Sequence, residues 1–177
     1  MTAWVDDVLS YWFGLQPEQW WFDKSLDDTV RERFQDLWET QRQCPVESFL
    51  GSPRGALAAV ILFDQFPRNM FRDHAEQFAT DHLALEIAKA AIDRGYDEDL
   101  TGPERGFLYM PFQHSEDLRD QERSLLLFAA LGDPEQLRFA RLHHDVIARF
   151  GRFPHRNAIL GRKPRAEELA AGDVVPW

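Results

Sequence analysis

Apolar residues recur at the spacing of an α-helix along most of this 177-residue chain, and this recurrence limits the folds open to it. Val5, Val8, Leu9 and Trp12 form one such stripe, and Gly14 follows it in the position of a C-terminal cap. Similar stripes lie between Leu26 and Trp38, Leu57 and Ile61, Ala75 and Arg94, Leu118 and Phe128, and Leu137 and Phe150. Strands are not expected, because β-branched residues are few and no long segment alternates apolar and polar residues. The pattern predicts an all-α protein of roughly seven or eight helices.

Residues that start and stop helices flank these stripes. Ser25 with Asp28 resembles a capping box, and Ser52 precedes Pro53 as an N-cap with proline in the first turn. Ser115 is expected to cap the helix that holds Leu118. Another helix starts at Asp133-Pro134, and a weaker last helix is predicted from Arg165 to Ala171. Predicted helix ends fall at Gly95, Pro111, Gly132 and Gly151.

The composition narrows the classes of partner. Thirty acidic residues against twenty basic ones give a net charge of −10, which would repel a nucleic-acid backbone. The longest uninterrupted apolar stretch, Ala56 to Phe63, is far shorter than a membrane span, and Asp6 and Asp7 do not fit a secretion signal. Cys44 is the single cysteine, so intrachain disulfides and cysteine-built zinc sites are excluded. We expect a cytoplasmic protein of one domain, residues 1–177, with neither a nucleic-acid nor a membrane partner.

Two segments repeat a Phe-Pro step followed by Arg-Asn. The first is Asp64-Gln-Phe-Pro-Arg-Asn69, and the second is Arg152-Phe-Pro-His-Arg-Asn157. Because proline opposes continuation of a helix, we expect each helix to stop there and the chain to turn sharply. The two corners are predicted to face one pocket. Its ligand-binding candidates are Asp64, Arg68, Asn69, Arg152, His155, Arg156 and Asn157.

Asp64 continues the apolar face of Leu57, Val60 and Ile61, so its carboxylate should be buried and should need a partner. Arg68, one turn further on, or an arginine of the C-terminal cluster can supply that partner. The pair can equally serve only to tie a helix end to a loop.

Histidines supply the candidate acid–base groups. His114 and Glu116 precede a predicted helix, and a histidine held by a carboxylate is the usual arrangement of a general base or a metal ligand. His143 shares a helix face with Phe139, Ile147 and Phe150, so it can instead be a hydrogen-bonded core residue. Together with His155, these residues could in principle form a metal site of two or three histidines and a carboxylate, but their spacing is not diagnostic. No metal is therefore assigned, and any cofactor stays unknown.

Four blocks of the sequence resemble the signature of the bacterial family DUF924. They are Trp12-Phe-Gly14, Asp64 to Asn69, Tyr109-Met-Pro-Phe-Gln-His-Ser-Glu116, and Arg149 to Asn157 with Leu160-Gly-Arg162. The resemblance covers nearly the whole chain, and the family also places a histidine where His143 stands. It implies a fold similar to tetratricopeptide-repeat (TPR) proteins, in which antiparallel helix pairs stack into a right-handed superhelix, and it implies no activity. Lys163-Pro164 departs from the Ser/Thr cap that the family has before its last helix.

Two classes of function stay open. In the first, the protein is a binding or interaction module, and its polar cluster forms an internal network or a pocket for a small anionic ligand. A protein or peptide partner could then bind an aromatic patch formed by Trp20, Trp21 and Phe22. In the second, the protein is an enzyme. His114 with Glu116, or His143, would then act as acid or base while Arg152 and Arg156 hold an anionic substrate.

Overall fold

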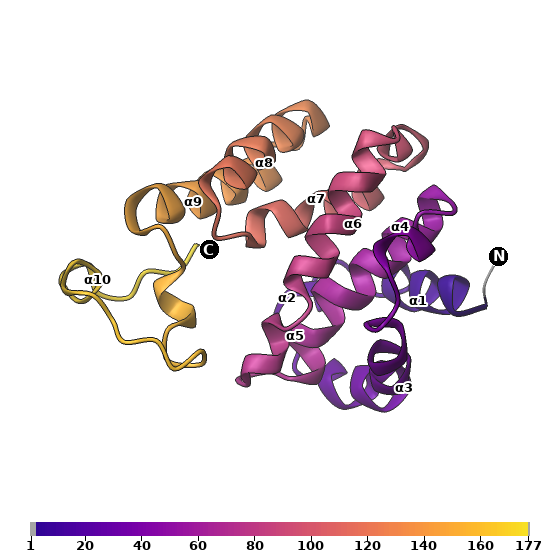
Figure 1. Ribbon diagram of the computed structural model, residues 1–177, viewed down its shortest axis with the longest axis horizontal. Coiled ribbons are helices and arrows are strands. Elements are labelled where there is room, and N and C mark those ends of the chain that lie inside the picture. The colour runs from indigo at the N-terminus through magenta and orange to yellow at the C-terminus, as the bar shows by residue number, and fades with distance from the viewer. Residues whose placement is uncertain (1–2, 177) are drawn as a thin grey trace. The chain divides into compact units, whose positions relative to one another are not determined.

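The computed structural model describes residues 3–176, apart from the side chains of Trp21 and Phe22. This part of the chain contains helices, turns and loops but no β-strand (Figure 1). Its helices are α1 (Ala3–Phe13), α2 (Gln19–Phe22), α3 (Leu26–Gln41), α4 (Pro53–Val60), α5 (Phe66–Met70), α6 (Asp81–Asp93), α7 (Gly102–His114), α8 (Leu118–Leu131), α9 (Pro134–Phe150) and α10 (Ala166–Ala171). If α4 and α5 are counted as one continuous helix and the single turn α2 is left out, residues 3–176 hold eight helices, as expected.

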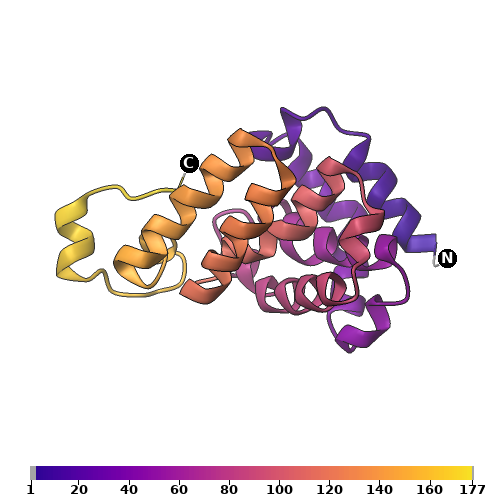
Figure 2. The ribbon, with the colours of Figure 1, turned by 90° about the horizontal axis from the view of Figure 1, so that it is seen from above.

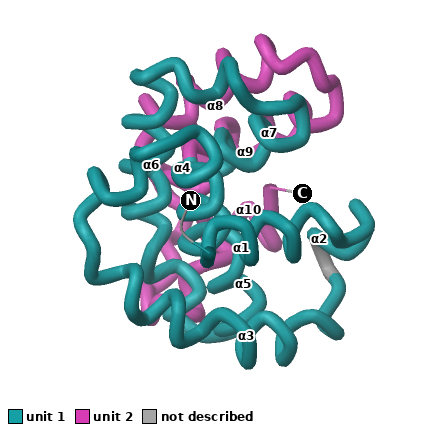
Figure 3. The backbone as a smooth tube through the Cα atoms, turned by 90° about the vertical axis from the view of Figure 1, so that its right-hand side faces the viewer, with its two compact units in different colours: residues 1–111 teal, residues 112–177 magenta. Residues whose placement is uncertain are grey.

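The chain divides into two compact units, residues 1–111 and residues 112–177 (Figure 3). In unit 1, α3 packs against α5, and α4 packs against both α1 and α6. Aromatic side chains fill the space between α1, α3 and α5, where the Phe66 ring lies 4.5 Å from that of Phe34 and 5.7 Å from that of Trp12. In unit 2, α8 and α9 are joined by a two-residue turn and lie side by side (Figures 1 and 2). The single-domain organisation stays a prediction.

Several sequence signals act as expected. The Ser52 hydroxyl accepts the Gly55 amide at 3.0 Å and caps α4, and Asp133 caps α9 through the amides of Glu135 and Gln136. α9 ends before Gly151, whose positive φ of 66° favours glycine. α10 covers most of the predicted last helix. Caps therefore locate helix ends well where their partners are local in sequence.

The expected stop at Phe66-Pro67 is wrong. The helix instead continues from α4 through a π-helical turn, Ile61–Gln65, into α5. The wider turn places Pro67 in the first turn of α5, where the missing amide is tolerated. In a regular α-helix the Phe63 carbonyl would lose its donor at Pro67; here it accepts the buried Thr80 hydroxyl at 2.7 Å.

Thr80 also explains why the helix expected over Ala75 to Arg94 is split. Its backbone is not helical, with φ −113° and ψ 10°, and its hydroxyl is directed to Phe63 rather than to a local acceptor. The segment forms a 3₁₀ turn, Ala75–Phe78, and then α6.

Three further predictions are wrong at helix ends. Pro111 lies inside α7, where the buried residues Phe112 and Gln113 keep the last turn of the helix packed. Asp117, rather than Ser115, caps α8 by accepting the Arg119 amide at 2.9 Å. Ser25 forms no capping box, because its hydroxyl donates to Asp23. At both serines, a nearby aspartate accepts the hydroxyl that the sequence pattern assigned to a cap.

Candidate functional site

In unit 2, two histidines and one arginine surround the buried ring of Phe153, and a third histidine lies beside one of these two. His114 is the last residue of α7, His143 lies on α9, and His155 and Arg156 belong to the 3₁₀ turn Pro154–Arg156. The ring centres of His114 and His143 are 6.2 Å apart, and that of Phe153 lies 5.7 Å from His143 and 5.5 Å from His155. We call these four polar residues, His114, His143, His155 and Arg156, the imidazole cluster.

The tautomer of His143 follows from its contacts. Its Nδ1 lies 2.8 Å from the Phe139 carbonyl, which can only accept, so Nδ1 carries the proton and Nε2 is left with a lone pair. Burial, followed by the charges of His114 and Arg156, lowers the pKa of His143 to about 3. His143 is therefore neutral at pH 7.

His155 has a similar electrostatic environment. Burial and then the neighbouring Arg156 charge lower its pKa to about 4, although Glu116 acts in the opposite direction. Arg156 itself is buried; its Nη2 donates to the His114 carbonyl at 3.1 Å, and its guanidinium lies 4.5 Å from the centre of the Phe153 ring. The cluster is thus a place where positive charge opposes imidazole protonation.

Glu116 is tied to the chain beside this cluster. Arg162 donates to both of its carboxylate oxygens, at 2.7 and 3.0 Å, and the Phe153 amide donates at 2.7 Å. Burial raises the pKa of Glu116, but the Arg162 and Phe153 hydrogen bonds outweigh it and the net shift is downward. Glu116 is thus an ionised anchor for the turn at Phe153, while its expected role in holding His114 stays a prediction.

Arg152 and Asn157 join a second carboxylate. Arg152 donates to Glu168 through Nε at 2.6 Å and Nη2 at 2.8 Å, and Asn157 Nδ2 donates to the same residue at 2.9 Å. Glu168 also accepts the Arg165 amide at 2.7 Å. This network attaches α10 to the end of α9, next to the core cluster of Val146, Ile147, Phe150 and Phe153. These two predicted ligand-binding residues are thus engaged in an internal network.

The predicted residues of the first corner form ion pairs within unit 1. Arg68 donates to both oxygens of Asp81, at 3.0 and 3.1 Å, and its Nη1 lies 3.7 Å from the fully buried Asp64, which confirms Arg68 as a partner of Asp64. Burial lowers the pKa of Arg68, but the two carboxylates outweigh it and raise it. Asn69 Nδ2 donates at 3.0 Å to Asp27, which also pairs with Arg72.

The structure therefore groups the predicted residues by unit: His114, Glu116, His143, Arg152, His155, Arg156 and Asn157 lie in unit 2, and Asp64, Arg68 and Asn69 lie in unit 1. The pocket shared by both corners stays a prediction. Sequence reasoning missed Glu168 and Asp27 as partners. Glu168 carried a signal, because it stands three residues after the expected start of the last helix, where a glutamate completes a capping box.

Three other features can be compared with the structure: a metal site, a membrane span and the aromatic patch. Within the described residues, no group of three or more His, Cys, Asp or Glu side chains could hold a metal ion, and no helix has the length and apolarity to cross a membrane. Of the proposed aromatic patch, Trp20 is partly buried, and its ring lies 5.0 Å from that of Phe107. The side chains of Trp21 and Phe22 lie outside the described residues.

Comparisons with known proteins agree with the four sequence blocks that resemble a family signature. The family described as "Bacterial protein of unknown function (DUF924)" matches residues 8–171. A solved structure, that of the protein of unknown function ATU0120 from Agrobacterium tumefaciens, is 38% identical in sequence, with a TM-score of 0.90 over 96% of each chain. A search of the curated proteins gives no match. The match over most of the chain means that this protein belongs to the DUF924 family of bacterial proteins.

Proposed function

We propose that the protein is a cytoplasmic binding module whose imidazole cluster takes a small oxyanion such as a phosphate or carboxylate group. The observation that carries this proposal is the gathering of two imidazoles and one guanidinium around Phe153, with a third imidazole beside one of these two. Guanidinium and imidazolium groups form charge-assisted hydrogen bonds to such anions.

The depressed pKa values support this assignment. His143 and His155 are held neutral partly by nearby positive charge, so a bound anion would offset that charge and favour their protonation. His143 Nε2 has a lone pair that can take up this proton while Nδ1 stays bonded to Phe139. Anion binding in the cluster is thus linked to proton uptake, and it should strengthen as the pH falls from 7 towards the pKa values of about 4 and 3 that His155 and His143 have in the free protein.

The architecture that we propose around this site is a TPR-like stack of antiparallel helix pairs. The α8–α9 hairpin supports it, since two helices of similar length are joined by the short Gly132-Asp133 turn. In such folds neighbouring helix pairs form extended surfaces for ligands.

Titration of the full chain with inorganic phosphate at pH 6 to 7 tests the anion site. The expected result is a shift of the His143 and His155 side-chain NMR signals, with an upward change in their pKa values on binding. The substitution Arg156→Gln should weaken phosphate binding by about tenfold or more, because it removes a charge-assisted donor.

The matched control is His144→Gln. His144 follows His143 on α9 but lies 3.1 Å from the exposed Asp145, so this substitution should leave phosphate binding unchanged. Because Arg156 also supports the end of α7, His155→Gln gives a second test that leaves the Arg156–His114 bond in place. The proposal is wrong if phosphate moves the signals of His74, His82 and His144 as much as those of the cluster.

A further inference from the structure

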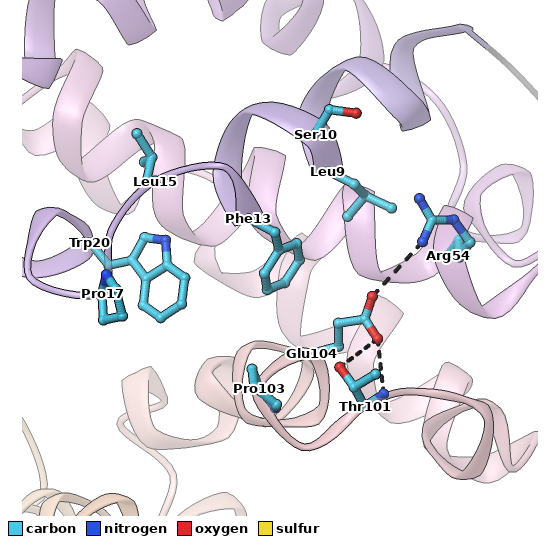
Figure 4. A pocket seen from close by; sticks show the side chains of 10 residues that line it. All are labelled: Leu9, Ser10, Phe13, Leu15, Pro17, Trp20, Arg54, Thr101, Pro103 and Glu104. Atoms are coloured by element: carbon cyan, nitrogen blue, oxygen red, sulfur yellow. Dashed lines mark hydrogen bonds and ion pairs between the residues drawn. The ribbon is translucent and has the colours of Figure 1, made fainter.

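A pocket of about 450 Å³ lies in unit 1, and none of its lining residues belongs to the imidazole cluster (Figure 4). α1, the turn after it, α2 and the starts of α4 and α7 contribute its lining. One wall is apolar and includes Leu9, Phe13 and Trp20, while Arg54 and Glu104 supply charge at the other end. Apolar and polar side chains therefore both contribute substantially to the lining, which suits a small molecule that carries charged as well as apolar groups.

The aromatic wall is held in place by contacts behind it. Trp20 Nε1 donates to the Trp12 carbonyl at 2.8 Å, which fixes the orientation of the indole. Phe107 supports both aromatic rings of the wall, since its ring centre lies 5.0 Å from Trp20 and 5.7 Å from Phe13, with near-perpendicular planes in both cases. A ligand would therefore meet a preformed apolar surface.

The charged end has unused hydrogen-bonding capacity. Glu104 Oε2 accepts the amide and hydroxyl of Thr101, at 2.9 and 2.8 Å, whereas its Oε1 faces Arg54 Nη1 at 3.8 Å. Arg54 Nη2 lies 3.7 Å from Asp6. Both separations exceed a hydrogen bond, so among the described residues the Arg54 guanidinium donates none. At the charged end of the pocket, a cation and a carboxylate thus face one another without a direct hydrogen bond.

From this geometry we infer that the pocket binds a free hydrophobic α-amino acid. The ligand carboxylate accepts from Arg54, the ligand ammonium donates to Glu104 Oε1, and the side chain packs on Phe13 and Trp20. Both charged contacts are of the strong, charge-assisted kind. A zwitterion is the class that satisfies both charges of the lining, one positive and one negative.

The net charge of unit 1 argues against a purely anionic ligand. Unit 1 holds 20 acidic and 10 basic residues, whereas unit 2 holds 10 of each, so the whole net charge of −10 resides in unit 1. A simple carboxylate would be repelled by Glu104, and a simple amine would leave the Arg54 guanidinium without an anionic partner. An amino acid avoids both penalties.

Calorimetric titration of the full chain with L-phenylalanine tests this inference against two analogues. Phenylethylamine lacks the carboxylate, and 3-phenylpropionate lacks the ammonium; each should bind at least about tenfold more weakly. Arg54→Gln and Glu104→Gln should weaken L-phenylalanine binding by a similar factor. Arg94→Gln, at an exposed position directly after the end of α6, is the matched control and should bind as the wild type does.

The Trp20 indole N–H signal in NMR spectra should shift on binding, which places the ligand in this pocket. Equal binding of L-phenylalanine and either analogue would overturn the inference, as would a lack of saturable L-phenylalanine binding up to about 10 mM. If Glu104→Gln fails to fold because α7 loses its Thr101 contact, the two analogues still decide the question with the wild-type protein.

Discussion

Replacing Thr80 by valine is expected to lower the free energy of unfolding by about 3 kcal/mol. The Thr80 hydroxyl accepts the Trp38 indole N–H at 3.0 Å and donates to the Phe63 carbonyl at 2.7 Å. Valine has nearly the same shape, but its side chain can neither accept nor donate a hydrogen bond. The Trp38 indole N–H and the Phe63 carbonyl would therefore both be buried without this partner. Each unsatisfied group costs about 1–3 kcal/mol. Urea unfolding of the wild type and of Thr80→Val measures the difference.

The size of this effect follows from burial. Thr80 and Trp38 are each 2% exposed and Phe63 is fully buried, so water cannot easily replace the lost hydroxyl. A loss of about 3 kcal/mol is a large part of the total stability of an ordinary domain, which is about 5–15 kcal/mol.

Thr40→Val is the matched control for this prediction. Thr40 lies near the exposed end of α3, and its hydroxyl donates locally to the Asp36 carbonyl. Its substitution should change the free energy of unfolding by less than about 0.5 kcal/mol. Trp38→Phe in the Thr80→Val background should cost less than in the wild type, because the indole N–H is already unpaired. Equal stability of Thr80→Val and Thr40→Val would contradict the role assigned to this hydroxyl.

Thr80 also shows why part of the fold could not be predicted from the sequence. Local signals were sufficient for the α-helical class, for the cap at Ser52 and for the stop at Gly151. The two larger errors, at Pro67 and in the segment before α6, have a common origin in the hydrogen bond between Thr80 and Phe63. These residues are 17 positions apart, so no local pattern of helix propensity reports their contact.

In the candidate site, too, local sequence signals predicted some features, while others depend on contacts between distant residues. His114, His155 and Arg156 could be selected because they lie in dense polar blocks next to predicted helix ends. His143 could be selected because it shares the apolar face of a predicted helix. Their partners could not, because Arg162 reaches Glu116 across 46 positions and any of several acids would have matched its charge. Residue type thus indicated which groups need partners, and tertiary structure decided which partners they have.

Glu168→Gln is expected to detach α10 from the end of α9 at pH 7. Four donors converge on the Glu168 carboxylate: Nε and Nη2 of Arg152, Nδ2 of Asn157 and the Arg165 amide. Glutamine offers a single oxygen, and its own amide protons would face these donors, so it cannot replace the carboxylate. Hydrogen exchange of the α10 amides should become roughly tenfold faster or more, and the midpoint of thermal unfolding should fall.

The pH dependence separates this role from a general loss of packing. Hydrogen bonds from Arg152, and then from the Arg165 amide, outweigh the effect of burial and lower the pKa of Glu168 from 4.5 to about 2. Its folded-state pKa lies below its unfolded value, so its stabilising contribution is complete above about pH 4.5 and is lost as the pH falls towards 2. The difference in unfolding midpoint between wild type and Glu168→Gln should therefore shrink across this range. Glu167→Gln, an exposed neighbour 3.8 Å from Arg165, should match the wild type throughout. A difference that stays constant from pH 7 to pH 2 would show that glutamine acts through packing rather than through the lost carboxylate.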